Sequence, residues 1–83
     1  MNREEAAIRL ANIMRDVFDN DDLEYRDGLT INGVPGWDSL VGHLRFLNAV
    51  EKDFGVEFTS GEVDMFENAG NILDAILLRE ARS

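Results

Sequence analysis

Apolar residues recur every three or four positions along most of this chain, and this helical period limits the fold more than any other feature of the sequence. From Arg3 to Phe18 the period is carried by Ala6, Leu10, Ile13, Met14, Val17 and Phe18. Because a helix turns through about 100° per residue, these side chains share one face of an amphipathic helix. Apolar and polar residues nowhere alternate for long enough to make a β-strand, so the sequence predicts an all-α fold.

The second helix has a residue type typical of a helix boundary at each end. Asp38 belongs to the types favoured at helix N-caps, and Gly55 is the type favoured just after a helix ends. We therefore expect a helix that opens at Asp38 and runs to about Phe54. The next residues, GVEF at 55–58, have a strand-like composition, but so short a stretch between helices is expected to be a connector.

The last part of the sequence predicts a short helix and a further long one. Thr59 or Ser60 is a suitable cap for a short segment that holds Val63, Met65 and Phe66. Asn68 is a suitable cap for a last helix, whose apolar stripe consists of Ala69, Ile72, Leu73, Ile76 and Leu77. Arg79 and Arg82 lie near its C-terminal end, where the helix dipole favours positive charge.

Residues 19–37, DNDDLEYRDGLTINGVPGW, interrupt the helical pattern. They hold three of the seven glycines and the only proline, which favour turns. The apolar residues of this segment are expected to reach the core and so to order the loop; they are Leu23, Leu29 and Ile31. The sequence thus predicts a small four-helix bundle with three long helices and one short one. A long ordered loop joins the first two helices, and the bundle forms a single domain over residues 1–83.

Length and charge exclude several classes of function. A chain of 83 residues buries a small core and has no room for a deep active-site cavity, so we do not expect an enzyme. It has no cysteine and a single histidine, His43, which excludes disulfides and a zinc site made of protein ligands alone. Its net charge of −9 would repel nucleic acid and anionic membranes, so the expected partners are proteins with basic docking patches. The first ten residues contain no apolar targeting segment, and we expect a cytoplasmic monomer.

The pentapeptide GWDSL at residues 36–40 ends the turn-rich loop and opens the second predicted helix. Together with EKDFGVEF at 51–58 and FENAGNILDAI at 66–76, it resembles the acyl and peptidyl carrier protein family. The signature of that family is Asp-Ser-Leu at the start of the second helix, which corresponds here to Asp38, Ser39 and Leu40. The resemblance covers nearly the whole chain, including its length, acidity and helix order.

The resemblance implies that Ser39 receives 4′-phosphopantetheine from coenzyme A through a separate phosphopantetheinyl transferase, with Asp38 as the flanking N-cap residue. The terminal thiol of this group would carry acyl or aminoacyl thioesters between the loading and condensing enzymes of fatty acid, polyketide or related biosynthesis. A phosphodiester in the first turn of a helix is stabilised by the free N–H groups and the helix dipole, by roughly 0.3 to 1 kcal/mol. Leu40, Val41 and Leu44 are candidates for contact with partner enzymes, although Leu40 and Leu44 could instead form a half-buried edge of the core.

Other interpretations of these residues are open. Asp38 and Ser39 could act only as a helix cap in an unmodified helical adaptor that keeps the carrier fold without the group. Ser39 and His43 are spaced like a nucleophile and its base, but GWDSLVG lacks the G-x-S-x-G pattern and so small a chain cannot enclose an oxyanion site. The acidic DNDD at 19–22 fails the EF-hand pattern at its fifth and sixth loop positions, so we expect no metal site there. Trp37 is expected to pack on the core rather than to form a platform for a ligand.

One spacing departs from the carrier family. In many carriers with a W-D-S-L start, a histidine follows the serine by three residues, and the phenylalanine that closes the helix follows by fourteen. Here His43 follows Ser39 by four residues and Phe54 follows it by fifteen, so one residue is extra. Either the first turn contains a bulge at Val41 and Gly42, or the helix starts later than Ser39.

Overall fold

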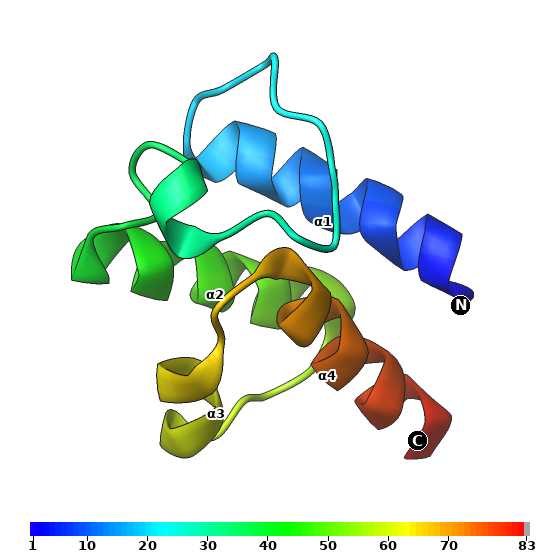
Figure 1. Cartoon of the computed structure of the whole chain (residues 1–83). Coiled ribbons are helices and arrows are strands. Elements are labelled where there is room, and N and C mark those ends of the chain that lie inside the picture. The colour runs from blue at the N-terminus through cyan, green and yellow to red at the C-terminus, as the bar shows by residue number, and fades with distance from the viewer. Residues whose placement is uncertain (83) are drawn as a thin grey trace.

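Helices joined by one long and two short connections make up the fold (Figure 1). The structure is a computed structural model that describes the backbone of residues 1–82 and the side chains of residues 1–80. Its elements are α1 (Arg3–Val17), the 3₁₀ turn η1 (Ile31–Gly33), α2 (Leu40–Phe54), α3 (Ser60–Met65) and α4 (Ala69–Arg82). Within residues 1–82 the only β-type pairing is an isolated bridge between Thr30 and Asn68. The predicted all-α fold, with three long helices and one short one, is confirmed.

α1 forms where the apolar period predicts it and ends one residue before the predicted end. The side chain of Asn2 caps it by accepting a hydrogen bond from the Glu5 amide at 2.8 Å. Ala6, Leu10 and Met14 are fully buried along one face of the helix. This face packs against both α2 and α4, so α1 lies across the other two long helices.

The long connection between α1 and α2 is tied to the N-terminus of α4. Its carbonyl oxygens accept the first amide hydrogens of that helix: Leu29 O accepts from Ala69 N at 2.8 Å, and Asp27 O accepts from Gly70 N at 2.9 Å. These bonds satisfy helix N–H groups that have no partner inside the helix. The apolar loop residues pack into or against the core as predicted, namely Leu23, Leu29 and Ile31.

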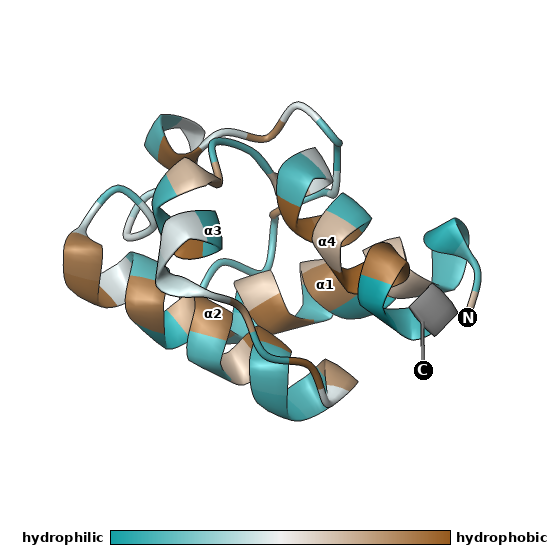
Figure 2. Ribbon diagram, turned by 90° about the horizontal axis from the view of Figure 1, so that it is seen from below, coloured by the Kyte–Doolittle hydropathy of each residue, from teal (hydrophilic) through white to brown (hydrophobic). Residues whose placement is uncertain are grey.

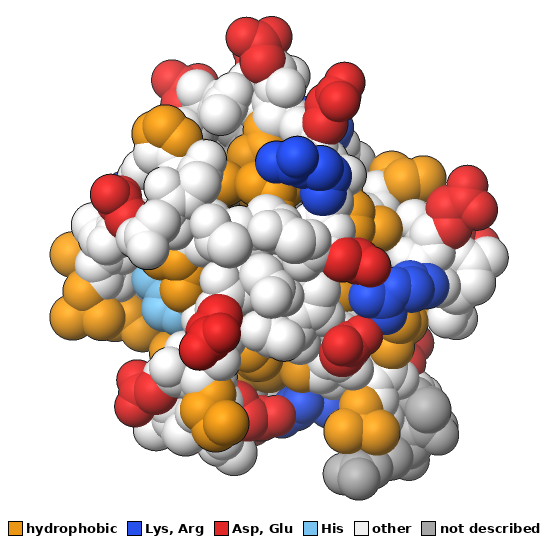
Figure 3. Space-filling view, in the orientation of Figure 1, with side chains coloured by type: hydrophobic (Ala, Val, Ile, Leu, Met, Phe, Trp, Pro, Cys, Tyr) orange, Lys and Arg blue, Asp and Glu red, His pale blue; other side chains and the backbone are white. Residues whose placement is uncertain are grey.

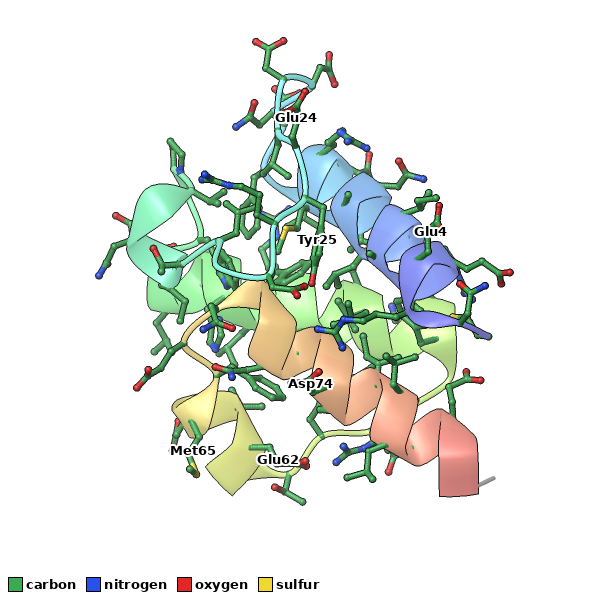
Figure 4. All side chains as sticks on the ribbon, turned by 45° about the vertical axis from the view of Figure 1, so that its right-hand side comes forward. Glu4, Glu24, Tyr25, Glu62, Met65 and Asp74 are labelled. Carbon is green, nitrogen blue, oxygen red and sulfur yellow. The ribbon has the colours of Figure 1, made fainter. Side chains whose placement is uncertain are left out.

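A polar cluster joins the same loop to the outer side of α1 and α4 (Figure 4). The Tyr25 hydroxyl donates to Asp27 Oδ1 at 2.6 Å, and Arg3 pairs with Asp27 at 3.3 Å and with Asp74 at 2.7 Å. The hydrogen bond from Tyr25, and then that from Arg3, lower the pKa of the Asp27 carboxyl. Because Arg3, Asp27 and Asp74 are exposed, water screens their charges, and the cluster orients the loop more than it stabilises the fold.

The predicted N-cap of α2, Asp38, is wrong: the N-cap residue is Ser39. Ser39 has extended backbone angles, φ −91° and ψ 149°, and its side chain accepts a hydrogen bond from the Gly42 amide. Asp38 lies exposed one residue before the cap. Both residue types cap helices well, so the path of the preceding turn, and not residue type, selects Ser39. The predicted end is confirmed: the helix closes at Phe54, and Gly55 follows in the left-handed conformation with φ 68°.

α3 and α4 begin at caps that the sequence predicted. Thr59 is the N-cap of α3 and forms a capping box, in which its side chain accepts from the Glu62 amide and the Glu62 carboxylate accepts from the Thr59 amide. The side chain of Asn68 accepts from the Asn71 amide at 2.9 Å in the first turn of α4. The connector at 55–58 is not a strand, as expected.

Arg79 of α4 holds α3 in place. Its guanidinium pairs with Glu62, donates to the carbonyl oxygen of Glu57 at 2.8 Å, and lies 5.1 Å from the centre of the Phe58 ring. It also donates to the carbonyl oxygen of Ala75 in the preceding turn of its own helix, as expected of a cation near a helix C-terminus. The side chain of Arg82, predicted to act similarly, lies outside the described residues.

Aromatic side chains join the long loop to α2 inside the core. Trp37 and Phe46 are completely buried and meet edge to face, with ring centroids 5.4 Å apart. The ring centroid of Phe18, just after α1, lies 5.5 Å from that of Phe46. Trp37 therefore packs on the core, as expected. No helix within residues 1–82 combines the length and the apolar composition needed to span a lipid bilayer.

Candidate functional site

A tight turn formed by Val34, Pro35, Gly36 and Trp37 leads the chain into α2. The Trp37 amide donates to the Val34 carbonyl oxygen at 3.0 Å, and Gly36 has a φ of 95°. Proline at the second position and a glycine with positive φ at the third are what a type II turn requires. The local sequence VPGW therefore sets the direction from which the chain enters the helix.

The hydroxyl of Ser39 takes part in two hydrogen bonds at the N-terminus of α2. Its Oγ accepts from the Gly42 amide at 2.9 Å and donates to the Gly36 carbonyl oxygen at 3.1 Å. The residue is exposed, so the hydroxyl is within reach of another protein. Ser39 thus lies at the junction of the turn and the helix, held from both sides by main-chain atoms.

The extra residue is accommodated by a later helix start, one of the two alternatives left by the sequence. α2 is an α-helix from Leu40 onward, with no bulge at Gly42. In a continuous helix, Ser39 would point within about 60° of the buried Phe46 and Phe54. It is exposed because its backbone is extended and the helical period does not apply to it.

Gly42 permits the close approach of the turn to the helix. A β-carbon on Gly42 would lie 1.8 Å from the Gly36 carbonyl oxygen and 2.9 Å from Ser39 Oγ. Any side chain there would overlap the backbone of the turn. The two glycines act together: Gly36 allows the positive φ of the turn, and Gly42 allows the turn to rest on the helix.

His43 is buried beneath this junction although it is polar. Its Nδ1 accepts from Nε1 of Trp37 at 2.9 Å, and its Nε2 lies 3.1 Å from the Val63 carbonyl oxygen. An indole N–H can only donate, so Nδ1 carries no hydrogen, and Nε2 carries one and donates it to Val63. The imidazole thereby links the entering turn, α2 and α3.

The nucleophile-and-base interpretation of Ser39 and His43 is excluded by this geometry. Both ring nitrogens of His43 are bonded to other groups, and the Ser39 hydroxyl donates to a backbone carbonyl instead. Nor does the part of the chain that the structure describes gather three side chains able to hold a metal ion, at the acidic loop 19–22 or elsewhere. The hydrogen bonds that the Ser39 hydroxyl makes are both to main-chain atoms, of Gly36 and Gly42.

Exposed apolar side chains follow Ser39 along α2. Leu40, Val41 and Leu44 are 73%, 66% and 43% exposed, and we call them the α2 apolar patch. They do not form a half-buried edge of the core. Figure 2 shows the hydrophobic colour at this N-terminal end of α2, and in Figure 3 hydrophobic side chains gather around the one histidine.

Met65 is an exposed residue that the sequence analysis placed in the short third helix but did not propose for contact with a partner. It is 77% exposed on α3, the helix that His43 ties to α2, and it points outward in Figure 4. The sequence held a weak signal for this exposure. α3 has only six residues and buries none of them, so an apolar side chain within it is poorly covered.

The residues at Ser39 fit a phosphate ester. The hydroxyl is exposed, it already accepts an amide hydrogen of α2, and no acidic residue lies in the first turn of that helix. The N-terminus of a helix favours negative charge through its free N–H groups and its dipole. A covalent phosphate on Oγ would therefore be placed where the backbone stabilises it.

Comparison with known proteins agrees with the sequence resemblance at the level of the fold. Neither the models of known families nor the curated proteins match this sequence. Among solved structures, the chain is similar to the holo acyl carrier protein of Geobacter metallireducens, determined by solution NMR, with a TM-score of 0.85 and 25% sequence identity. The match covers 93% of this chain and 87% of that one. The chain has an acyl-carrier-protein-like fold.

Proposed function

We propose that this protein is a discrete carrier, modified with 4′-phosphopantetheine on Ser39. The observation that carries the proposal is the exposed Ser39 hydroxyl at the N-cap of α2, in a fold similar to that of a holo acyl carrier protein. When bound, the group supplies a thiol that carries acyl or aminoacyl groups as thioesters. The protein itself is not an enzyme in this proposal.

The chain's own residues would position the group rather than react with it. Gly36 and Gly42 hold Ser39 at the helix start. The first N–H groups of α2 would stabilise the negative charge of the phosphate. His43 and Trp37 keep the turn and α3 attached to α2 beneath that position. Asp38 flanks the serine and lies exposed, where it can contact the modifying enzyme.

The partners in this proposal are a phosphopantetheinyl transferase and the loading and condensing enzymes of fatty acid, polyketide or related biosynthesis. Leu40, Val41 and Leu44 give these enzymes an apolar contact beside Ser39. Asp38 and Asp64 are exposed acidic residues that would meet basic docking patches. A reducing compartment such as the cytoplasm would keep the carrier thiol free of disulfides, and we propose that the protein acts there as a monomer.

Intact-mass measurement after incubation with coenzyme A, Mg²⁺ and a broad-specificity phosphopantetheinyl transferase tests the proposal. The wild-type protein should gain the mass of one phosphopantetheinyl group, and Ser39→Ala should gain none. Ser60→Ala is the matched control, because Ser60 is also an exposed serine at a helix start, and it should be modified like the wild type. A gain that survives Ser39→Ala would assign the site elsewhere.

The second candidate function is an unmodified helical adaptor with the carrier fold. The double hydrogen bonding of Ser39 favours it, because a serine that serves only as an N-cap needs no further role. The same measurement separates the two functions, since an adaptor would show no mass gain with the wild-type protein.

A further inference from the structure

The charges on α2 differ from the charge of the whole chain. Although the net charge is −9, the helix has no carboxylate from Leu40 to Val50. Its two carboxylates, near the C-terminal end, are both engaged: Glu51 accepts from the Phe58 amide at 2.8 Å, and Asp53 pairs with Arg9 at 2.8 Å. Most of the outward surface of α2 is therefore free of negative charge.

Two cations of α2 are unpaired. Arg3, Arg9 and Arg79 each form an ion pair, whereas Arg45 and Lys52 are exposed and form none within the described residues. The chain has 17 acidic and 8 basic residues, so enough carboxylates are present for every cation to form an ion pair. Two cations left unpaired on one helix are available to a partner.

These cations lie on one line with an apolar residue. Val41, Arg45, Asn48 and Lys52 are spaced by three or four positions, so they fall within about 60° of one another around the helix axis. All four are exposed, and we call them the α2 outer stripe. The stripe begins beside Ser39, and Arg45 lies about 9 Å further along the axis.

The stripe borders a shallow hollow between α2 and α1. Arg45, Asn48 and Lys52 line it together with Asp16 and Val17 of α1. Asp16 is the one carboxylate in the lining, and it forms no ion pair with either cation. The hollow is thus lined by two positive charges, one negative charge and the uncharged side chains of Val17, Asn48 and Ala49.

We propose that the α2 outer stripe docks on a partner protein that places carboxylates opposite Arg45 and Lys52 and an apolar surface opposite Val41. Charge complementarity selects this partner, because the stripe offers unpaired cations and no free carboxylate. The inference deepens the proposed function and rests on it only in that Ser39 lies at one end of the stripe. The negative net charge acts over longer distances than this contact and is screened within about 10 Å at 0.1 M salt.

The test uses the unmodified protein and two synthetic amphipathic helical peptides with the same leucine stripe. One peptide carries glutamates beside the leucines, and the other carries lysines. In NMR titrations at low salt, the glutamate peptide should shift the amide signals of Val41, Arg45 and Lys52 and bind more tightly than the lysine peptide. The combined variant Arg45→Glu with Lys52→Glu should bind the glutamate peptide about five- to tenfold more weakly.

Arg26→Glu is the control, because Arg26 is another exposed cation without an ion pair in residues 1–80, located in the loop. It changes the net charge by the same amount as one stripe substitution and should leave binding unchanged. Tighter binding of the lysine peptide at the stripe, an equal loss in Arg26→Glu, or no shifts with either peptide would each overturn the proposal. Because this test uses the unmodified protein and no transferase, failure of this inference is distinct from failure of the modification.

Discussion

The carbonyl oxygen of Gly36 occupies the space that a β-carbon on Gly42 would need, at a separation of only 1.8 Å. Gly42→Ala must therefore push the turn away from α2, and we expect it to lower the free energy of unfolding by about 1 to 3 kcal/mol despite alanine's better helix propensity. The same displacement should slow modification of Ser39. Chemical denaturation and the transferase assay would measure the two effects.

Gly61→Ala is the matched control for that variant. Gly61 is also a helical glycine, but its nearest neighbour would lie 4.0 Å from a new β-carbon, so alanine should stabilise the protein by up to about 1 kcal/mol. If Gly42→Ala were as stable as Gly61→Ala, that result would contradict the close contact between the Gly36 carbonyl and Gly42.

Ser39 should contribute to stability as well as to modification. Ser39→Ala removes the N-cap of α2 and should cost about 1 kcal/mol, whereas Ser39→Asp keeps a capping side chain and should cost little. Both variants should lack the phosphopantetheinyl group. Asp38→Ala should leave the denaturation midpoint nearly unchanged. A loss of stability equal to that of Ser39→Ala would show that Asp38 is the N-cap of α2.

The buried pair of His43 and Trp37 should show strong coupling. Replacing either residue by Phe leaves a buried nitrogen without its partner, at a cost of about 1 to 3 kcal/mol, whereas replacing both removes donor and acceptor together. The double variant should therefore be clearly more stable than the sum of the single losses predicts. A double-mutant cycle from denaturant unfolding measures this, and strict additivity would contradict the hydrogen bond.

Glu62 should make the attachment of α3 sensitive to acid. The hydrogen bond from the Thr59 backbone, followed by that from Arg79, lowers the pKa of the Glu62 carboxyl from its ordinary 4.5. A depressed pKa means that the stabilisation is present above pH 4.5 and is lost as the pH falls through the lower folded value. As the pH falls through this window, the α3 amides should lose protection against hydrogen exchange, relative to the intrinsic exchange rate at each pH.

Two variants on α3 check the assignment to Glu62. Glu62→Gln should remove this loss of protection at low pH and should give weaker protection already at neutral pH. Asp64→Asn replaces an exposed carboxylate on the same helix and should keep the wild-type profile. If the pH dependence of α3 protection disappeared in Asp64→Asn, the carboxylate responsible would be Asp64 and not Glu62.

Much of the fold follows from local sequence. The apolar periods predicted α1 and α4 to within a residue or two, and Gly55, Thr59 and Asn68 marked boundaries correctly, because caps and stops depend on groups close in the chain. Asp38 failed as the cap for the opposite reason. The position of the cap depends on how the VPGW turn meets α2, which is a contact of backbone atoms that residue types do not report.

Side-chain environments at the site were less predictable than the helices. His43 lies on the apolar face of α2, but its burial depends on two partners, Trp37 and Val63, that lie in other elements. The unpaired state of Arg45 and Lys52 is likewise a property of the assembled fold. The net charge alone predicted partners with basic docking patches, and it does not report which cations of the folded chain lack an ion pair.

The attachment of the long loop to α4 divides that loop into two parts with different tolerance to engineering. Residues 19–22 lie exposed or half-exposed at the outer end, whereas Asp27 and Leu29 supply acceptors to the first amides of α4. A flexible insertion between Asp21 and Asp22 would lengthen a segment that holds no helix, at a cost that grows only slowly with length. The same insertion after Gly28 would separate those two acceptors and loosen the first turn of α4, so a fused tag or reporter domain belongs at the outer end.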